Sequence, residues 1–215
     1  MTTTLFASPA WPTVPVKGET AQYPVHRIFC VGRNYAEHVK EMGNDVKGTP
    51  IFFMKPADAI VLDGRFPYPG GSDDVHHEIE LVVALGPDAK IFGHAVGIDM
   101  TRRDLQAKAK AGGKPWESAK AFDHSAPIGS ITPGTEALTS GAITLDVNGT
   151  RRQSADLSDM IWNTSEILAE LSKLFTLKAG DLIFTGTPAG VGAIRRGDHM
   201  HGSIAGLGAL DVEVT

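Results

Sequence analysis

The chain has 215 residues, of which 42% are hydrophobic and 21% are charged, as expected for one globular unit with a sizeable core. Its formal net charge of -5 and its thinly spread Lys and Arg residues argue against a nucleic-acid partner. No stretch reaches the roughly eighteen apolar residues of a membrane span, and the first ten residues do not have the pattern of a secretion signal.

The N-terminal residues predict an extended arm followed by a single domain. Residues 1–24 contain four prolines and little periodicity, whereas no repeat or linker interrupts residues 25–215. The first clear strand is predicted over 25–31. It contains Cys30, the only cysteine, which we expect to be a buried structural thiol. The absence of a cysteine pair fits a reducing cytoplasm.

A short helix is predicted next, over residues 35–42, with Asn34 as its N-cap. His38 and Glu41 are three residues apart and therefore share one face of it. They form either an ordinary polar face or a dyad in which the carboxylate orients the imidazole to take a proton from water. The polar, glycine-containing residues 43–49 have the composition of a loop that can close over a ligand.

Residues 76–85 begin as an alternation of polar and apolar residues and end as an apolar run, which predicts a strand entering the core. Alternate side chains of a strand project to opposite faces, so Glu78 and Glu80 lie on the same face. Such a pair suits a hard divalent cation, which would offset the repulsion between the carboxylates. The alternative for this short pattern is a solvent-facing acidic edge.

Two further charged residues have open interpretations. Asp99 follows a strand predicted over 92–98 and precedes a helix predicted over 103–111, so it is either a ligand at a strand end or a cap for that helix. Lys120 lies among small and apolar residues. It is either a surface lysine whose stem packs on the protein or a cation that points into a site.

The C-terminal half predicts a hairpin, one long helix and two more strands. Asn148-Gly149 is a strong turn signal between strands at 142–147 and from Thr150 onward. Residues 161–175 have the spacing of an amphipathic helix that packs on a sheet. Strands are predicted at 181–185 and at 210–214, so the chain is mostly β.

The loop over residues 186–192 is rich in glycine but does not have the pattern of a nucleotide-binding loop. No Gly-Lys-Ser/Thr follows, and Pro188 interrupts the loop. We expect its backbone amides and Thr187 to line a small anionic ligand instead.

Several motifs follow one another in a fixed order. They are Gly32-Arg33-Asn34-Tyr35, Lys55-Pro56, His77-Glu78-Ile79-Glu80-Leu81, Asp99-Met100-Thr101-Arg102-Arg103-Asp104, Lys120-Ala121-Phe122-Asp123 and Thr185-Gly186-Thr187-Pro188. Over residues 25–215 this set resembles the fumarylacetoacetate hydrolase family, in its acylpyruvase branch. The opening Trp11 to Val16 and the run Gly180 to Ala193 are most similar to the fumarylpyruvate hydrolases of gentisate breakdown.

The resemblance implies a fold of mainly β type with α (α+β). It would be a mixed β-sandwich roll of the fumarylacetoacetate hydrolase C-terminal domain type, with one substantial packed helix and a short lid helix, in a homodimer. It also implies one Mg²⁺ or Mn²⁺ per site and a role for each candidate residue. These are Glu78, Glu80 and Asp99 as metal ligands, Arg103, Gln106 and Thr187 as substrate contacts, and His38, Glu41 and Lys120 as catalytic residues.

The function implied by the resemblance is metal-dependent hydrolysis of a carbon–carbon bond in a 2,4-dioxo acid. The expected substrate is 3-fumarylpyruvate, which would yield fumarate and pyruvate. The alternatives are an oxaloacetate decarboxylase or another acylpyruvate hydrolase, and a metal-binding relative without activity. His38 and Glu41 together favour hydrolysis, because decarboxylation needs no activated water.

Overall fold

The computed structural model describes residues 5–7, 10–37 and 49–215. The proposed dyad residues His38 and Glu41, and most of the helix predicted over 35–42, lie outside the described residues. Among the helices that are described, none is long and apolar enough to cross a membrane.

Strands account for more of the described residues than helices do, and many of them are short. The strands are β1 (Thr13–Pro15), β2 (Gln22–Pro24), β3 (Arg27–Gly32), β4 (Ile51–Lys55), β5 (Ile60–Val61), β6 (Arg65–Phe66), β7 (Val75–His77), β8 (Ile79–Leu85), β9 (Ile91–Ile98), β10 (Thr101–Arg102), β11 (Ala126–Pro127), β12 (Thr132–Pro133), β13 (Ala142–Val147), β14 (Thr150–Asp156), β15 (Asp181–Phe184), β16 (Gly192–Ala193), β17 (His199–Ile204) and β18 (Gly208–Val214). The helices are α2 (Arg103–Ala111), α3 (Glu117–Lys120) and α4 (Thr164–Leu174), with 3-10 turns η1 (Ala57–Ala59), η2 (Pro87–Ala89) and η3 (Leu157–Asp159).

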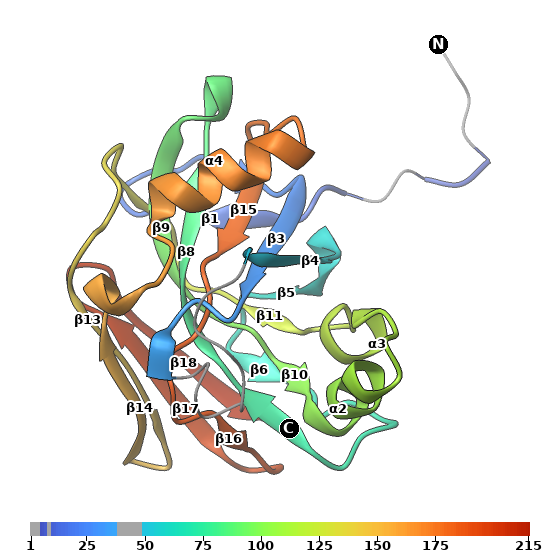
Figure 1. The fold of residues 1–215 in the computed structure, drawn as a ribbon. Coiled ribbons are helices and arrows are strands. Elements are labelled where there is room, and N and C mark those ends of the chain that lie inside the picture. Colours follow the sequence, from blue (N-terminus) through green and yellow to red (C-terminus); the bar gives the residue numbers. More distant parts are fainter. Residues whose placement is uncertain (1–4, 8–9, 38–48) are drawn as a thin grey trace.

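Two larger sheets form the body of the protein (Figure 1). The first has the strand order β12-β9-β8-β15-β3-β4, with β15 and β3 parallel and the other pairs antiparallel. The second has the order β14-β13-β17-β18-β6. The mixed, mainly β architecture with few helices agrees with the predicted fold class.

Strand β8 lies in the middle of the six-stranded sheet, and all of its residues are buried. Its alternate side chains enter two separate clusters, as the two-residue period of a strand requires. Leu81 and Val83 join a cluster that faces the five-stranded sheet, whereas Val82 and Ala84 join a cluster on the opposite face. Burial on both faces explains why the second half of this strand is apolar at every position.

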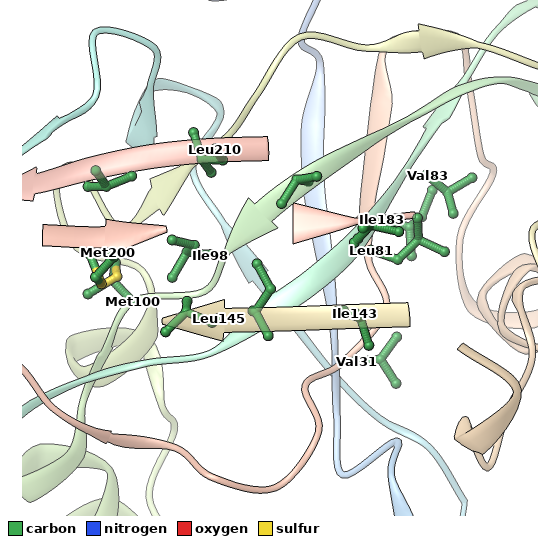
Figure 2. Packing of buried hydrophobic residues seen from close by; sticks show 14 of the residues in the cluster. Val31, Leu81, Val83, Ile98, Met100, Ile143, Leu145, Ile183, Met200 and Leu210 are labelled. Carbon is green, nitrogen blue, oxygen red and sulfur yellow. The ribbon is translucent and has the colours of Figure 1, made fainter. Parts of the chain in front are cut away.

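The larger cluster fills the space between the two sheets. Ile143 and Leu145 of β13 belong to the same cluster as Leu81, Ile98 and Ile183 of the six-stranded sheet, and Figure 2 labels these residues. The smaller cluster is covered by the β1–β2 hairpin, from which Val14 and Tyr23 are buried. The hairpin therefore packs on the sheet, and the division of the chain at residue 24 stays a prediction.

The predicted turn at Asn148-Gly149 is confirmed. β13 and β14 pair antiparallel across it, and both turn residues have left-handed backbone angles, with φ of 51° and 75°. These angles are those of a type I′ turn, which fits the twist of the flanking strands.

The helix predictions are confirmed in part. Helix α2 has the predicted bounds, but α4 begins at Thr164 rather than at residue 161. The difference arises because Asn163 and Glu166 form a capping box, which fixes the first turn after Asn163. Ile167 and Leu171 form the buried face of α4, at the opposite end of the molecule from α2 and α3 (Figure 1).

Gly97 of β9 lies opposite Glu80 of β8 and has no room for a side chain. An added Cβ would lie 2.6 Å from Val82 Cγ2 and 2.7 Å from the Phe184 ring. We expect Gly97→Ala to lower the free energy of unfolding by about 1–3 kcal/mol through overpacking, measured by urea denaturation. The matched control is Gly70→Ala, where no atom lies within 4 Å of the added Cβ. Equal stability of the two variants would contradict this packing argument.

Candidate active site

Three buried carboxylates lie together where β8 begins and β9 ends. Glu78 immediately precedes β8, Glu80 is its second residue, and Asp99 immediately follows β9. One oxygen from each residue lies within 4.8 Å of the other two. Glu78 and Glu80 therefore share one face, as their spacing predicted. Pairing of β8 with β9 brings Asp99 to them, and the Asp99 N–H donates to the Glu78 carbonyl at 2.8 Å.

The environment of Glu80 disfavours its negative charge. Burial, and then the charges of Asp99 and Glu78, raise the pKa of Glu80 well above its ordinary value. One opposing contact is the hydrogen bond that the Gly186 N–H donates to Glu80 Oε2 at 2.7 Å. A cation placed between the carboxylates would remove the cause of this repulsion.

Lys120 contacts two of the three carboxylates directly. Its Nζ lies 2.8 Å from Glu78 Oε2 and 2.6 Å from Asp99 Oδ2, and it donates to Thr101 Oγ1. Burial lowers the pKa of Lys120, but the two carboxylates outweigh burial and raise it above the usual value. Lys120 is therefore a cation within the site and not a surface lysine.

A second lysine, Lys55, also contacts the acidic cluster, although the sequence motif Lys55-Pro56 predicted no role for it. It is buried at the end of β4, and its Nζ lies 2.8 Å from Asp99 Oδ1. It also donates to the carbonyls of Met100 and Lys120. Asp99 thus holds two lysines, and the alternative of a helix cap is wrong. The N-cap of α2 is Arg102, with no side-chain cap bond.

The predicted substrate contacts lie beside the acidic cluster. Arg103 and Gln106 stand on the first turns of α2, and the Arg103 guanidinium donates to Glu78 Oε1 and to Gln106 Oε1. Arg103, Gln106 and Thr187 line a common cavity with Glu78. The substrate roles of these residues stay predictions, but the structure brings them together.

Thr187 is hydrogen-bonded to Gln153 of the second sheet, a residue that no pattern in the sequence indicated. The buried Gln153 of β14 donates to Thr187 Oγ1 at 2.8 Å and to the Pro188 carbonyl. Its Oε1 accepts from the Ile79 N–H and lies 3.0 Å from His77 Nδ1. Thr187 in turn donates to the Ile79 carbonyl. Gln153 therefore ties the start of β8 to the loop that carries Thr187.

The donor set suits a divalent cation. Three carboxylates supply the hard oxygen ligands that Mg²⁺ and Mn²⁺ accept, and they converge in a buried position where their mutual repulsion is unfavourable. All three residues are buried, so the Glu-x-Glu pattern is not the solvent-facing acidic edge that the sequence also allowed.

The chain is similar to known proteins over most of its length. Residues 27–215 match the family described as "Fumarylacetoacetate (FAA) hydrolase C-terminal". The chain is 44% identical to fumarylpyruvate hydrolase from Pseudomonas aeruginosa, solved in complex with Mn²⁺ and pyruvate, with a TM-score of 0.96 over 99% of each chain. It is 43% identical over 199 residues to oxaloacetate tautomerase YcgM of Escherichia coli (strain K12), covering 86% of this chain and 90% of the relative. A mitochondrial oxaloacetate decarboxylase of Dictyostelium discoideum is 36% identical over 195 residues, covering 84% and 89%.

We expect removal of the Glu80 charge to have opposite effects on the stability of the fold without metal and with metal. Folding raises the pKa of Glu80. Ionisation of Glu80 therefore destabilises the metal-free fold at any pH above the pKa that this carboxyl group has in the unfolded chain. We expect Glu80→Gln at pH 7 to unfold at the same temperature as metal-free wild type or at a higher one. Mn²⁺ at about 100 times its Kd should stabilise wild type by about 2.7 kcal/mol, and this gain should be lost in the variant.

The measurement is thermal unfolding after chelation and again after Mn²⁺ is added. The matched control is Glu213→Gln, which changes an exposed glutamate of β18 and should keep the full response to Mn²⁺. A full response in Glu80→Gln would exclude Glu80 as a metal ligand.

Proposed function

The chain belongs to the fumarylacetoacetate hydrolase family, and we propose that it is a metal-dependent hydrolase that cleaves 3-fumarylpyruvate into fumarate and pyruvate. The proposal rests above all on the convergence of Glu78, Glu80 and Asp99 around a buried position that Lys120 shares. The likeness to a fumarylpyruvate hydrolase over nearly the whole chain supports this substrate over other dioxo acids.

The residues that would hold Mg²⁺ or Mn²⁺ are Glu78, Glu80 and Asp99. When bound, the cation supplies a Lewis acid for the 2-oxo acid end of the substrate. Arg103 and Gln106, on the rigid first turns of α2, are positioned to orient that end by hydrogen bonds.

Hydrolysis requires water to attack the acyl carbonyl, after which the carbon–carbon bond breaks and its electron pair forms the enolate of pyruvate. Lys120 is held beside the carboxylates by direct ion pairs, so its positive charge is in place before the enolate charge develops. His38, oriented by Glu41, is proposed to take the proton from water. The enolate then takes a proton at carbon and becomes pyruvate.

Oxaloacetate tautomerisation or decarboxylation is the second candidate, and the named activities of the Escherichia coli and Dictyostelium discoideum relatives favour it. Each reaction passes through an enol or enolate of a 2-oxo acid, so the same carboxylates and Lys120 serve all three. Only hydrolysis needs an activated water, which makes the His38–Glu41 pair the discriminating feature. The homodimer, the gentisate pathway and the cytoplasmic location stay predictions from the resemblance.

A direct assay separates these activities. We expect the purified protein to consume 3-fumarylpyruvate and to release fumarate and pyruvate in equal amounts, with activity lost on chelation and restored by Mg²⁺ or Mn²⁺. Oxaloacetate should be tautomerised and decarboxylated with a lower kcat/KM, measured by ultraviolet absorbance and pyruvate release. A higher kcat/KM for oxaloacetate would replace hydrolysis with the second candidate.

The dyad hypothesis predicts that His38→Ala lowers kcat for hydrolysis by about 10²–10⁴-fold, the usual contribution of a positioned general base. Stabilisation by Mn²⁺ and binding of pyruvate should remain, since His38 is not assigned to either. The control is His199→Ala, which removes an exposed histidine of β17 and should leave kcat unchanged. Full activity of His38→Ala would exclude the dyad.

A further inference from the structure

The cavity beside the acidic cluster has a cationic wall that the proposed roles do not explain. It is lined by Glu78 and Thr187 and also by Arg33, Arg103 and Lys110. Arg33 follows β3, whereas Arg103 and Lys110 lie two turns apart on α2. Segments distant in the sequence therefore bring three basic side chains to a single small cavity.

Arg103 is already engaged, because its guanidinium donates to Glu78 and to Gln106. Arg33 and Lys110 differ from it: neither forms an ion pair or a side-chain hydrogen bond within the part of the chain that is described. The Nε of Arg33 is buried and has no hydrogen-bond partner among those residues. An unpaired buried guanidinium nitrogen is costly, so a ligand that accepts a hydrogen bond there would be stabilising.

Lys110 is held close to the other cations. Its Nζ lies 5.1 Å from the centroid of the Trp116 ring, which also lines the cavity. Burial, and then the charges of Arg103 and Arg33, lower the pKa of Lys110 to about 8. The wall therefore carries excess positive charge that an anion would offset.

The backbone at Arg33 has an uncommon conformation. Its φ is 64°, a left-handed angle that a residue with a long side chain adopts at a cost. The next residue, Asn34, fixes the turn, because its side chain bonds to the carbonyls of Trp162 and Thr185 and accepts from the Trp162 N–H. Backbone held in such a conformation is common where a side chain serves a ligand.

We propose that Arg33 and Lys110 form a subsite for the second carboxylate of a dicarboxylate substrate, at the end remote from the 2-oxo acid. This inference rests on the proposed function, in which Glu78, Glu80 and Asp99 serve the 2-oxo acid end. Arg33 supplies a planar donor and Lys110 a point charge, a pairing suited to one carboxylate. The subsite selects a fumaryl group over an uncharged acyl group such as acetyl.

The kinetic test compares 3-fumarylpyruvate with acetylpyruvate, which lacks the second carboxylate. Removing a hydrogen bond to a charged group costs about 1.5–3 kcal/mol, so Lys110→Met should lower kcat/KM for 3-fumarylpyruvate by about 10- to 150-fold. Its kcat/KM for acetylpyruvate should stay within about 3-fold of wild type, and Lys110→Arg should restore most of the selectivity. Arg33→Asn, which tolerates the left-handed backbone, should lose selectivity in the same way.

The matched control is Lys108→Met, an exposed lysine on the same helix, which should keep wild-type selectivity. Equal losses for both substrates in Lys110→Met would overturn the subsite, because they would indicate a general effect on the active site.

A binding measurement gives an answer that does not depend on turnover. Titration calorimetry of the Mn²⁺-loaded protein compares fumarate with crotonate, in which a methyl group replaces one carboxylate. Wild type should bind fumarate at least about 10-fold more tightly, and Lys110→Met should remove this preference. If 3-fumarylpyruvate is not hydrolysed but this preference exists and depends on Lys110, the proposed function fails and the subsite stands. Equal binding of the two ligands to wild type, or no binding of fumarate, overturns the subsite.

Discussion

The main constraint on this protein is the burial of three carboxylates, Glu78, Glu80 and Asp99, within one small volume. Charges removed from water are costly unless opposite charges meet them at close range. Lys55 and Lys120 each contact one carboxylate oxygen of Asp99. Arg103 and Lys120 contact Glu78. Burial and the neighbouring carboxylates outweigh the favourable contacts of Glu80 and raise its pKa. A divalent cation would offset this excess of negative charge.

The rest of the structure keeps this cluster rigid. β8 is buried on both faces in the middle of the six-stranded sheet, so its backbone has little freedom where Glu80 projects. The register with β9 places Asp99, and Gln153 from the second sheet anchors the Ile79 N–H together with Thr187. Sites built on packed strands hold ligand groups in place more accurately than sites built on loops.

The proposed roles give the cavity next to the cluster two different sides. Its acidic side, at Glu78, suits a metal and the 2-oxo acid end of a substrate, whereas Arg33 and Lys110 on its basic side suit a second carboxylate. With the proposed role of Lys120, hydrolysis, tautomerisation and decarboxylation would all develop enolate character beside that lysine. On the proposal made here for this chain, the choice among these activities depends less on the metal and Lys120 than on whether water is activated. That step is assigned to His38 and Glu41, outside the described residues.

Local patterns in the sequence determined the features that depend on neighbours along the chain. The shared face of Glu78 and Glu80 follows from the two-residue period of a strand, and the hairpin at Asn148-Gly149 follows from the angles that this turn requires. The motif order further indicated the family. Only the tertiary structure decided between a cap and a site residue for Asp99, and between a surface and a buried cation for Lys120. It alone identified Gln153, which contacts the site from the second sheet. These outcomes depend on strand register and on contacts between distant segments, which no local pattern encodes.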